Sequence, residues 1–248
     1  MSGHSHYATI KRQKEVKDSA KGKIFSKLGK AISIAVKAGG GTDPEANYKL
    51  RMAIDAARSA NMPKVNIDRA ITKGSGEVDN IEEVAYEGFG PGGIAIIVQA
   101  ATDNRNRTGQ EIKNIFEKGG GNLAGPGSVS FNFEPKGFLL VQKENNLEEQ
   151  MFKLIDCGAE DIEETGDGLE IFTNYNDLAK VKKEVEIAGL TVRSSSLVQK
   201  PKNLMQIQDG YTASKALALL EKFEDLDDVQ EVYSNIDISP DIMTQVSS

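Results

Sequence analysis

The order of strands and helices between residues 137 and 198 constrains the fold of this chain more than any other feature. Hydrophobic periodicity and turn residues predict six elements there, at residues 138–142, 147–157, 161–164, 169–173, 176–188 and 190–198. Their order, β-α-β-β-α-β, is typical of a ferredoxin-like module. Because Pro135 and Pro201 bracket the pattern, we expect residues 135–202 to form an inserted ferredoxin-like α/β domain.

The segments on either side of this module are each too short to form a stable core alone. The elements predicted in them are strands at 84–89 and 94–101, a helix at 109–118, a strand at 129–133 with alternating apolar and polar residues, a helix at 212–223 and a strand near 229–233. We therefore expect residues 78–134 plus 203–240 to form one discontinuous α/β domain, also ferredoxin-like, around the insertion.

Residues 1–77 are predicted to form a basic helical domain with a flexible N-terminal arm. Apolar residues recur at helical steps in the first predicted helix, namely Ile24, Phe25, Leu28, Ile32, Ala35 and Val36. Thr42 or Asp43 is expected to cap a second helix with Pro44 in its first turn, and a third helix is expected to end at Gly74. The fold class is therefore α+β: a small helical bundle followed by two ferredoxin-like domains, the last inserted into the middle one.

Three glycines, Gly88, Gly90 and Gly93, have the spacing of a dinucleotide-binding loop. Such a site requires a helix directly after the glycines. The apolar run at residues 94–101 predicts a strand instead, so we reject a dinucleotide site. We expect a β-hairpin in which Pro91 and Gly92 form a type II turn.

Charge is distributed unevenly along the chain. The formal net charge is −7, yet residues 1–73 contain 15 Lys and Arg against 6 Asp and Glu. A sign asymmetry of this size suggests a basic, nucleic-acid-facing arm on an acidic body. The alternative is a solvated helical face on which the lysines cluster by chance.

The arm supplies most of the candidate nucleic-acid-binding residues. The basic candidates are Lys11, Arg12, Lys14, Lys17, Lys21, Lys23 and Lys27, which would bind phosphates with a steep dependence on salt. His4, His6 and Tyr7 would stack on bases or form hydrogen bonds with them.

A second candidate is the segment from Thr102 to Thr108, between a predicted strand and the helix that follows. Unpaired backbone N–H groups and the positive end of the helix dipole point there, so the corner favours an anion such as phosphate. Arg105 and Arg107 would be its anchors. The alternative is that Asp103 or Asn104 caps the helix while both arginines face solvent, and both functions are compatible.

Residues that could carry catalysis are scarce. His4 and His6 are the only histidines, and two ligands without neighbours make a weak metal site. Cys157 has no histidine to activate it and is expected to be a small buried residue. Glu224 to Asp228 is expected to be a solvated acidic loop. We therefore expect no enzyme activity, cofactor, metal or small-molecule substrate.

Several bulk features bear on location. No apolar run approaches the ~18 residues of a membrane span, and no secretory signal or organelle presequence is visible. A single cysteine suits a reducing compartment. We expect a cytoplasmic protein with no membrane partner.

Blocks of sequence from the N-terminus to Phe133 resemble the YebC/PmpR family. They are Gly3–Tyr7, the basic run 11–14, Lys23–Leu28, Asn61–Pro63, Tyr86–Gly88, Pro91–Gly93, Thr102–Thr108, Gly120–Leu123 and Gly127–Phe131. Tyr7 stands where the family usually has tryptophan, so an aromatic ring is retained. The resemblance implies a three-domain, DNA-binding transcriptional regulator. It also implies an alternative, a ribosome-associated translation factor that binds rRNA or tRNA and relieves stalling at sequences such as consecutive prolines.

The residues themselves leave the nucleic acid open. No helix-turn-helix or zinc-finger pattern is visible, and a basic arm that folds on binding suits RNA. A protein-interaction module, in which the arm is incidental, is the remaining alternative.

Overall fold

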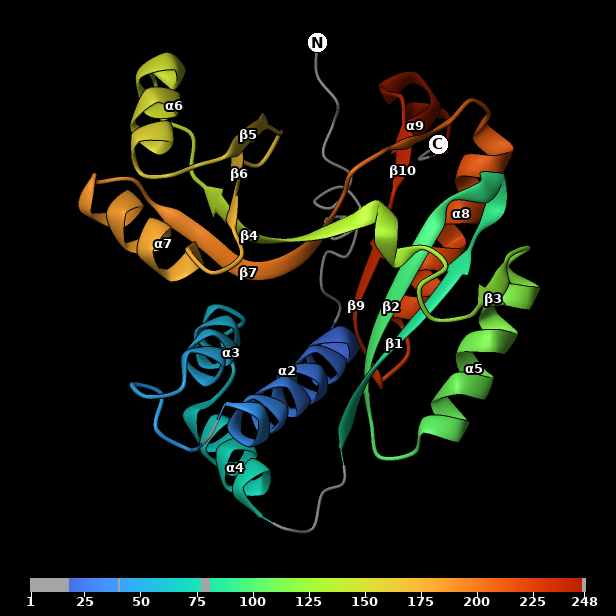
Figure 1. The fold of residues 1–248 in the computed structure, drawn as a ribbon, viewed down its shortest axis with the longest axis horizontal. Helices are drawn as coiled ribbons and strands as arrows, with labels where there is room; N and C mark the ends of the chain where they lie inside the picture. Colours follow the sequence, from blue (N-terminus) through green and yellow to red (C-terminus); the bar gives the residue numbers. More distant parts are fainter. Residues whose placement is uncertain (1–17, 40, 77–80, 247–248) are drawn as a thin grey trace. The chain divides into compact units, whose positions relative to one another are not determined.

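The computed structural model describes residues 18–39, 41–76 and 81–246, and the side chains from Gly22 onward. These residues belong to two compact units (Figure 1). One contains residues 18–132 and 203–246, and the other contains residues 133–202. The class is α+β, as predicted, with a three-helix region followed by sheets and helices.

The helical region consists of α2 (Asp18–Ala38), α3 (Tyr48–Ser59) and α4 (Lys64–Ser75). Its core includes Ile32, which lies on the predicted apolar face of the first helix, together with Leu50 and Ile67. The predicted start of the second helix is wrong. Asn47 caps α3 by accepting a hydrogen bond from Leu50 N (3.0 Å), and its amide also donates to Ala35 O (2.7 Å). The segment that contains Pro44 is a turn before the helix, and α3 begins after Asn47, which is also held by its bond to α2.

The first sheet has the strand order β3-β1-β2-β9, with each pair antiparallel. The strands are β1 (Glu82–Phe89), β2 (Ala95–Thr102), β3 (Asn122–Ala124) and β9 (Val229–Ser234). Helices α5 (Arg105–Lys118) and α8 (Gly210–Glu224) share its core, where the rings of Phe116 and Phe223 lie 4.6 Å apart.

The hairpin between β1 and β2 has the predicted turn. Gly93 N donates to Gly90 O (3.0 Å) across the short helix η1 (Pro91–Gly93). Gly92 has φ 73° and ψ 7°, the values that position i+2 of a type II turn requires. A strand follows the glycines, so no dinucleotide loop is formed.

The strand predicted at residues 129–133 is wrong. Residues Ser130–Asn132 form the short helix η2, and Phe131 is 71 % exposed. The buried carboxylate of Glu87 accepts hydrogen bonds from the backbone N–H groups of Gly127 (2.8 Å), Val129 (2.7 Å) and Ser130 (2.9 Å). These bonds hold the segment as a loop, and the edge strand of the sheet is β3 instead.

The second unit contains β4 (Phe133–Val141), α6 (Leu147–Asp156), β5 (Asp161–Glu164), β6 (Leu169–Asn174), α7 (Leu178–Ile187) and β7 (Val192–Pro201). This is the predicted order of elements, and the sheet order is β5-β6-β4-β7, all antiparallel. Leu139, Leu154 and Ile171 are fully buried in it.

The two sheets place their strands in the same way. In the first sheet, β2 precedes the first helix and lies between β1 and β9, and β9 follows the second helix. In the second sheet, β4 has the same position between β6 and β7. The chain order differs, because β1 precedes β2 whereas β6 follows β4 and β5. The first sheet therefore shares this arrangement of strands with the second, while two of its strands precede its first helix, as the sequence predicted.

The C-terminal segment contains more elements than the short extended piece, the helix and the strand that were predicted for it. Strands β8 (Met205–Ile207) and β10 (Ile236–Ile238) form a parallel pair. Helix α9 (Pro240–Val246), which was not predicted, packs Ile242 and Met243 against the core of the first sheet.

Candidate nucleic-acid interface

The corner between β2 and α5 is capped, as one of the two interpretations predicted. The side chain of Asn104 accepts a hydrogen bond from Arg107 N (3.1 Å), and Thr102 Oγ1 accepts one from Asn104 N (2.9 Å). The helix therefore begins at Arg105, four residues before the predicted start at Gly109.

The anion in this corner belongs to the protein. Asp228 Oδ2 accepts hydrogen bonds from Arg107 Nη2 (2.8 Å), Thr108 Oγ1 (2.7 Å) and Thr102 Oγ1 (3.2 Å). Burial alone would raise the pKa of Asp228, but Lys30, Arg107 and Thr108 hold it well below its usual range. Asp228 is 9 % exposed, so the prediction that Glu224–Asp228 is a solvated loop is wrong for this residue.

A row of lysines on α2 contacts the same segment. The α2 lysine row consists of Lys23, Lys27 and Lys30, which share one face of the helix because they are spaced by four and three residues. Lys27 Nζ donates to Glu224 O (2.6 Å), and Lys30 Nζ donates to Asp227 O (3.0 Å) and Asp228 Oδ1 (2.6 Å). Lys23 Nζ lies 3.9 Å from Asp225 Oδ1.

The C-terminal end of α8 attracts the positively charged lysines of the α2 lysine row. The last carbonyl groups of a helix lack intrahelical partners and carry its negative dipole end. Glu224 is the last residue of α8 and Asp225 follows it, so the row meets these carbonyls directly. Lys30 and Arg107 hold the two oxygens of the Asp228 carboxylate, which links α2 to α5.

The two candidate arginines of the corner have different surroundings. Arg107 pairs with Asp103 (2.9 Å) as well as with Asp228 (2.8 Å), and these partners raise its pKa. Arg105 is exposed, and its guanidinium forms no ion pair or hydrogen bond within the described part of the chain. Its carbonyl accepts a hydrogen bond from Tyr86 Oη (3.1 Å). Arg105 is therefore the arginine that remains available to an external anion.

The other predicted residues lie at the start of the chain. His4, His6, Tyr7, Lys11, Arg12, Lys14 and Lys17 are outside the described residues, as is the side chain of Lys21. Lys23 and Lys27 belong to the α2 lysine row, and the structure brings them together with the acidic segment and not with Arg105.

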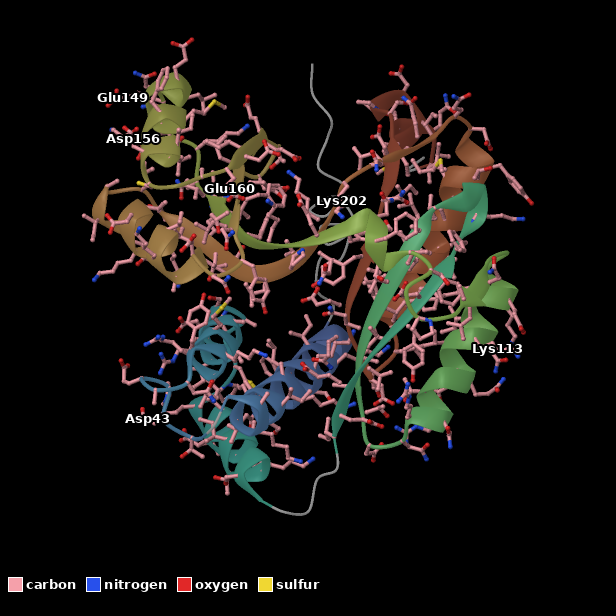
Figure 2. The ribbon with its side chains drawn as sticks, viewed as in Figure 1. Asp43, Lys113, Glu149, Asp156, Glu160 and Lys202 are labelled. Carbon is pink, nitrogen blue, oxygen red and sulfur yellow. The ribbon has the colours of Figure 1, made fainter. Side chains whose placement is uncertain are left out.

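Further cations lie on the surface, and the sequence analysis did not single them out. Lys49 on α3 and Lys64 and Arg69 on α4 are exposed. The charge asymmetry indicated this region, but the helical spacing alone did not separate its exposed face from its buried one. On α5, Lys113 points outward (Figure 2) and lies 3.8 Å from Glu117 Oε1.

Other chemistry is sparse in the described part of the chain. No group of three or more His, Cys, Asp or Glu residues there could hold a metal ion. Cys157 was expected to be buried and is half-buried, and this burial raises the pKa of its thiol. None of the described helices has both the length and the apolar character needed to cross a membrane.

Comparisons with known proteins cover the chain from end to end. Residues 5–77 match a family model described as the TACO1/YebC protein N-terminal domain. Residues 81–236 match one described as the TACO1/YebC second and third domain.

Individual relatives are similar over their full lengths. A probable transcriptional regulatory protein of Sulfurihydrogenibium sp. is 48 % identical over 99 % of both chains. One of Dictyoglomus turgidum is 45 % identical over 100 % of both. The crystal structure of a conserved hypothetical protein from Aquifex aeolicus superposes with a TM-score of 0.88 at 45 % identity, covering 95 % of this chain and 98 % of that one.

Proposed function

The chain belongs to the TACO1/YebC family, and on that premise we propose that it is a non-enzymatic, cytoplasmic regulator of gene expression that binds nucleic acid. The observation that carries this proposal is the concentration of positive charge in the first 73 residues of an otherwise acidic chain. A basic region of this kind binds phosphates without regard to sequence and speeds association with a polyanion.

We place the interface on the basic start of the chain and on the exposed cations near it. His4, His6, Tyr7 and the lysines and arginine from Lys11 to Lys27 form its first part. Arg105, exposed at the start of α5, forms a second contact. Arg107 contributes by orienting this turn, since its own guanidinium holds Asp103 and Asp228.

Duplex DNA is the partner we favour, in keeping with the names of the relatives as probable transcriptional regulators. The connection between α3 and α4 supports it. Two helices of 12 residues are joined by residues 60–63, and Asn61 adopts φ 59° in this turn. The lengths are compatible with a helix-turn-helix unit, which the sequence analysis did not find. Lys64, Val65 and Arg69 are exposed on α4.

Structured RNA, including rRNA or tRNA on the ribosome, is the second candidate. The densest basic run, residues 11–23, precedes the packed part of the helical region. A basic segment beside a folded domain suits the irregular surface of RNA.

We also propose three domains: residues 1–77, residues 78–134 plus 203–240, and residues 135–202, with both α/β domains ferredoxin-like. Separate cores support the first boundary, since the buried residues of the helical region and of the first sheet form two clusters without common members. The compact unit at residues 133–202 supports the other two.

Co-sedimentation from a cell lysate tests the proposal and separates the two candidates. The tagged protein is layered on a gradient with no nuclease, with DNase or with RNase. A DNA-binding regulator leaves the heavy fractions after DNase, whereas a ribosome-bound factor stays with ribosomes after DNase and leaves after RNase. A protein that sediments alone in all three gradients contradicts both candidates.

A further inference from the structure

The α2 lysine row has contacts in the structure that a nucleic acid would have to replace. Lys23 and Lys27 are candidate phosphate-binding residues, yet Lys27 donates to Glu224 O at 2.6 Å and Lys23 lies against Asp225. An ammonium group that holds a carbonyl or carboxylate oxygen has fewer donors left for a phosphate. Nucleic acid and the acidic end of α8 therefore require the same side chains.

The segment that the row contacts offers oxygens in a series, as a phosphate backbone does. The carbonyl oxygens of Glu224, Asp225 and Asp227 and the carboxylate of Asp228 accept hydrogen bonds from the three lysines, and the carboxylate of Asp225 forms an ion pair with Lys23. From Lys23 to Lys27 the helix rises about 6 Å. That is close to the axial rise of about two nucleotides in one DNA strand.

Resting on the proposed function, we propose that Lys23 and Lys27 of the α2 lysine row form a phosphate-binding track that Glu224 and Asp225 occupy in the free protein, so that nucleic acid must displace this end of α8 to bind there. The competitor is built into the chain, and it lowers the affinity of the row for any polyanion. The surface that becomes available is the basic face of α2.

The contacts differ in how easily they exchange. The side chains of Lys23 and Asp225 are 52 % and 50 % exposed. Water and salt therefore screen this ion pair, and it contributes little to the stability of the contact. Asp228 is buried and also held by Arg107 and Thr108, so its contact with Lys30 persists. Lys23 and Lys27 are therefore the residues that exchange partners, and Lys30 with Asp228 anchors α2 while they do so.

Charge-neutral variants of the acidic segment test the competition. D225N/D227N removes two exposed carboxylates and leaves Asp228 in place. The matched control, E111Q/D241N, removes two exposed carboxylates that form no ion pair with α2 among the described residues. Two labelled probes are used, a duplex DNA of mixed sequence and an RNA hairpin. Each probe is titrated with four proteins: the wild-type chain, D225N/D227N, the control E111Q/D241N, and D225N/D227N combined with K23Q/K27Q. Thermal unfolding verifies that each variant is folded.

The proposal predicts that D225N/D227N binds about threefold to tenfold more tightly than wild type, the range expected when weak surface pairs are lost. The control should change little, and the gain should vanish in the K23Q/K27Q background. If wild type binds and D225N/D227N binds equally well, or if the control gains as much, the competition is refuted while the proposed function stands. If neither the wild type nor D225N/D227N binds either probe, both are refuted.

Discussion

At the scale of single residues, Asp228 has the most consequential position in the described part of the chain. It accepts hydrogen bonds from Lys30 on α2 and from Arg107 and Thr108 on α5. Removing one member of a buried charge cluster leaves the remaining charges without compensation. We expect Asp228→Asn to lower the free energy of unfolding by about 1–3 kcal/mol. Asp227→Asn, at an exposed neighbour, should change it by less than about 0.5 kcal/mol. Urea unfolding of both variants measures the difference, and equal stabilities would contradict the role of Asp228.

The same carboxylate predicts a pH dependence. Because the folded-state pKa of Asp228 is lowered, its contribution to stability is fully present above the pKa of the unfolded chain, about 3.9. It is lost as the pH falls from there toward the folded-state pKa. The stability difference between wild type and Asp228→Asn should therefore be constant from pH 7 to about pH 5 and shrink below about pH 4. A difference that stays constant into acid would refute this.

Arg105 and Arg107 should separate binding from stability. Arg105→Ala is expected to reduce the salt slope of nucleic-acid binding by about 1 and to leave stability within about 0.5 kcal/mol. Arg107→Ala should instead lower stability by more than Arg105→Ala does, since it removes the ion pairs with Asp103 and with the buried Asp228. Binding across a salt series and thermal unfolding of the two variants are compared. The assignment fails if Arg105→Ala is the destabilised variant.

At the scale of elements, one carboxylate shapes the loop before β4. Burial alone would raise the pKa of Glu87, but hydrogen bonds from Val129, Gly127 and Ser130 lower it. Glu87→Gln replaces one accepting oxygen by a donor, so at least one of these N–H groups loses its partner. We expect hydrogen exchange of these amides to accelerate about tenfold, for a loss of about 1.4 kcal/mol. Glu83→Gln, on the exposed part of β1, is the control and should leave the loop amides unchanged.

Elements with a strong local signal were predictable. The run 94–101 became β2, the Pro91–Gly92 turn has the predicted geometry, and the inserted module has the predicted order of elements. The strand expected at 129–133 failed because local alternation contains no information about Glu87, which lies about 40 residues earlier in the chain. Helix α3 begins later than expected because Asn47 hydrogen-bonds to α2 as well as to its own first turn.

The candidate site was predictable only in part. Asn104 was one of the two caps considered, and the corner does bind an anion. Asp228 was missed because Thr108 and Arg107 are 120 and 121 residues away in the chain, and because its neighbours are all consistent with an acidic loop. A pairing of this kind depends on tertiary structure and leaves no periodic signal in the sequence.

At the scale of the whole molecule, the proposed function depends on how the basic helical region is joined to the acidic remainder. Within the larger unit, the helical core and the core of the first sheet are separate. Polar contacts of the α2 lysine row join α2 to the end of α8. Salt and polyanions weaken polar contacts of this kind, whereas they do not weaken contacts between apolar side chains in this way.

The central claim is that the basic start of the chain binds nucleic acid. The most direct test measures the binding of duplex DNA across a salt series by the full chain and by a chain without residues 1–17. The truncation removes Lys11, Arg12, Lys14 and Lys17 and leaves α2 complete. If these residues bind phosphates, the full chain binds more tightly, and the slope of log K against log salt is steeper by about 3 to 4. Equal affinities and equal slopes for the two chains would contradict the claim that the basic start of this protein binds nucleic acid.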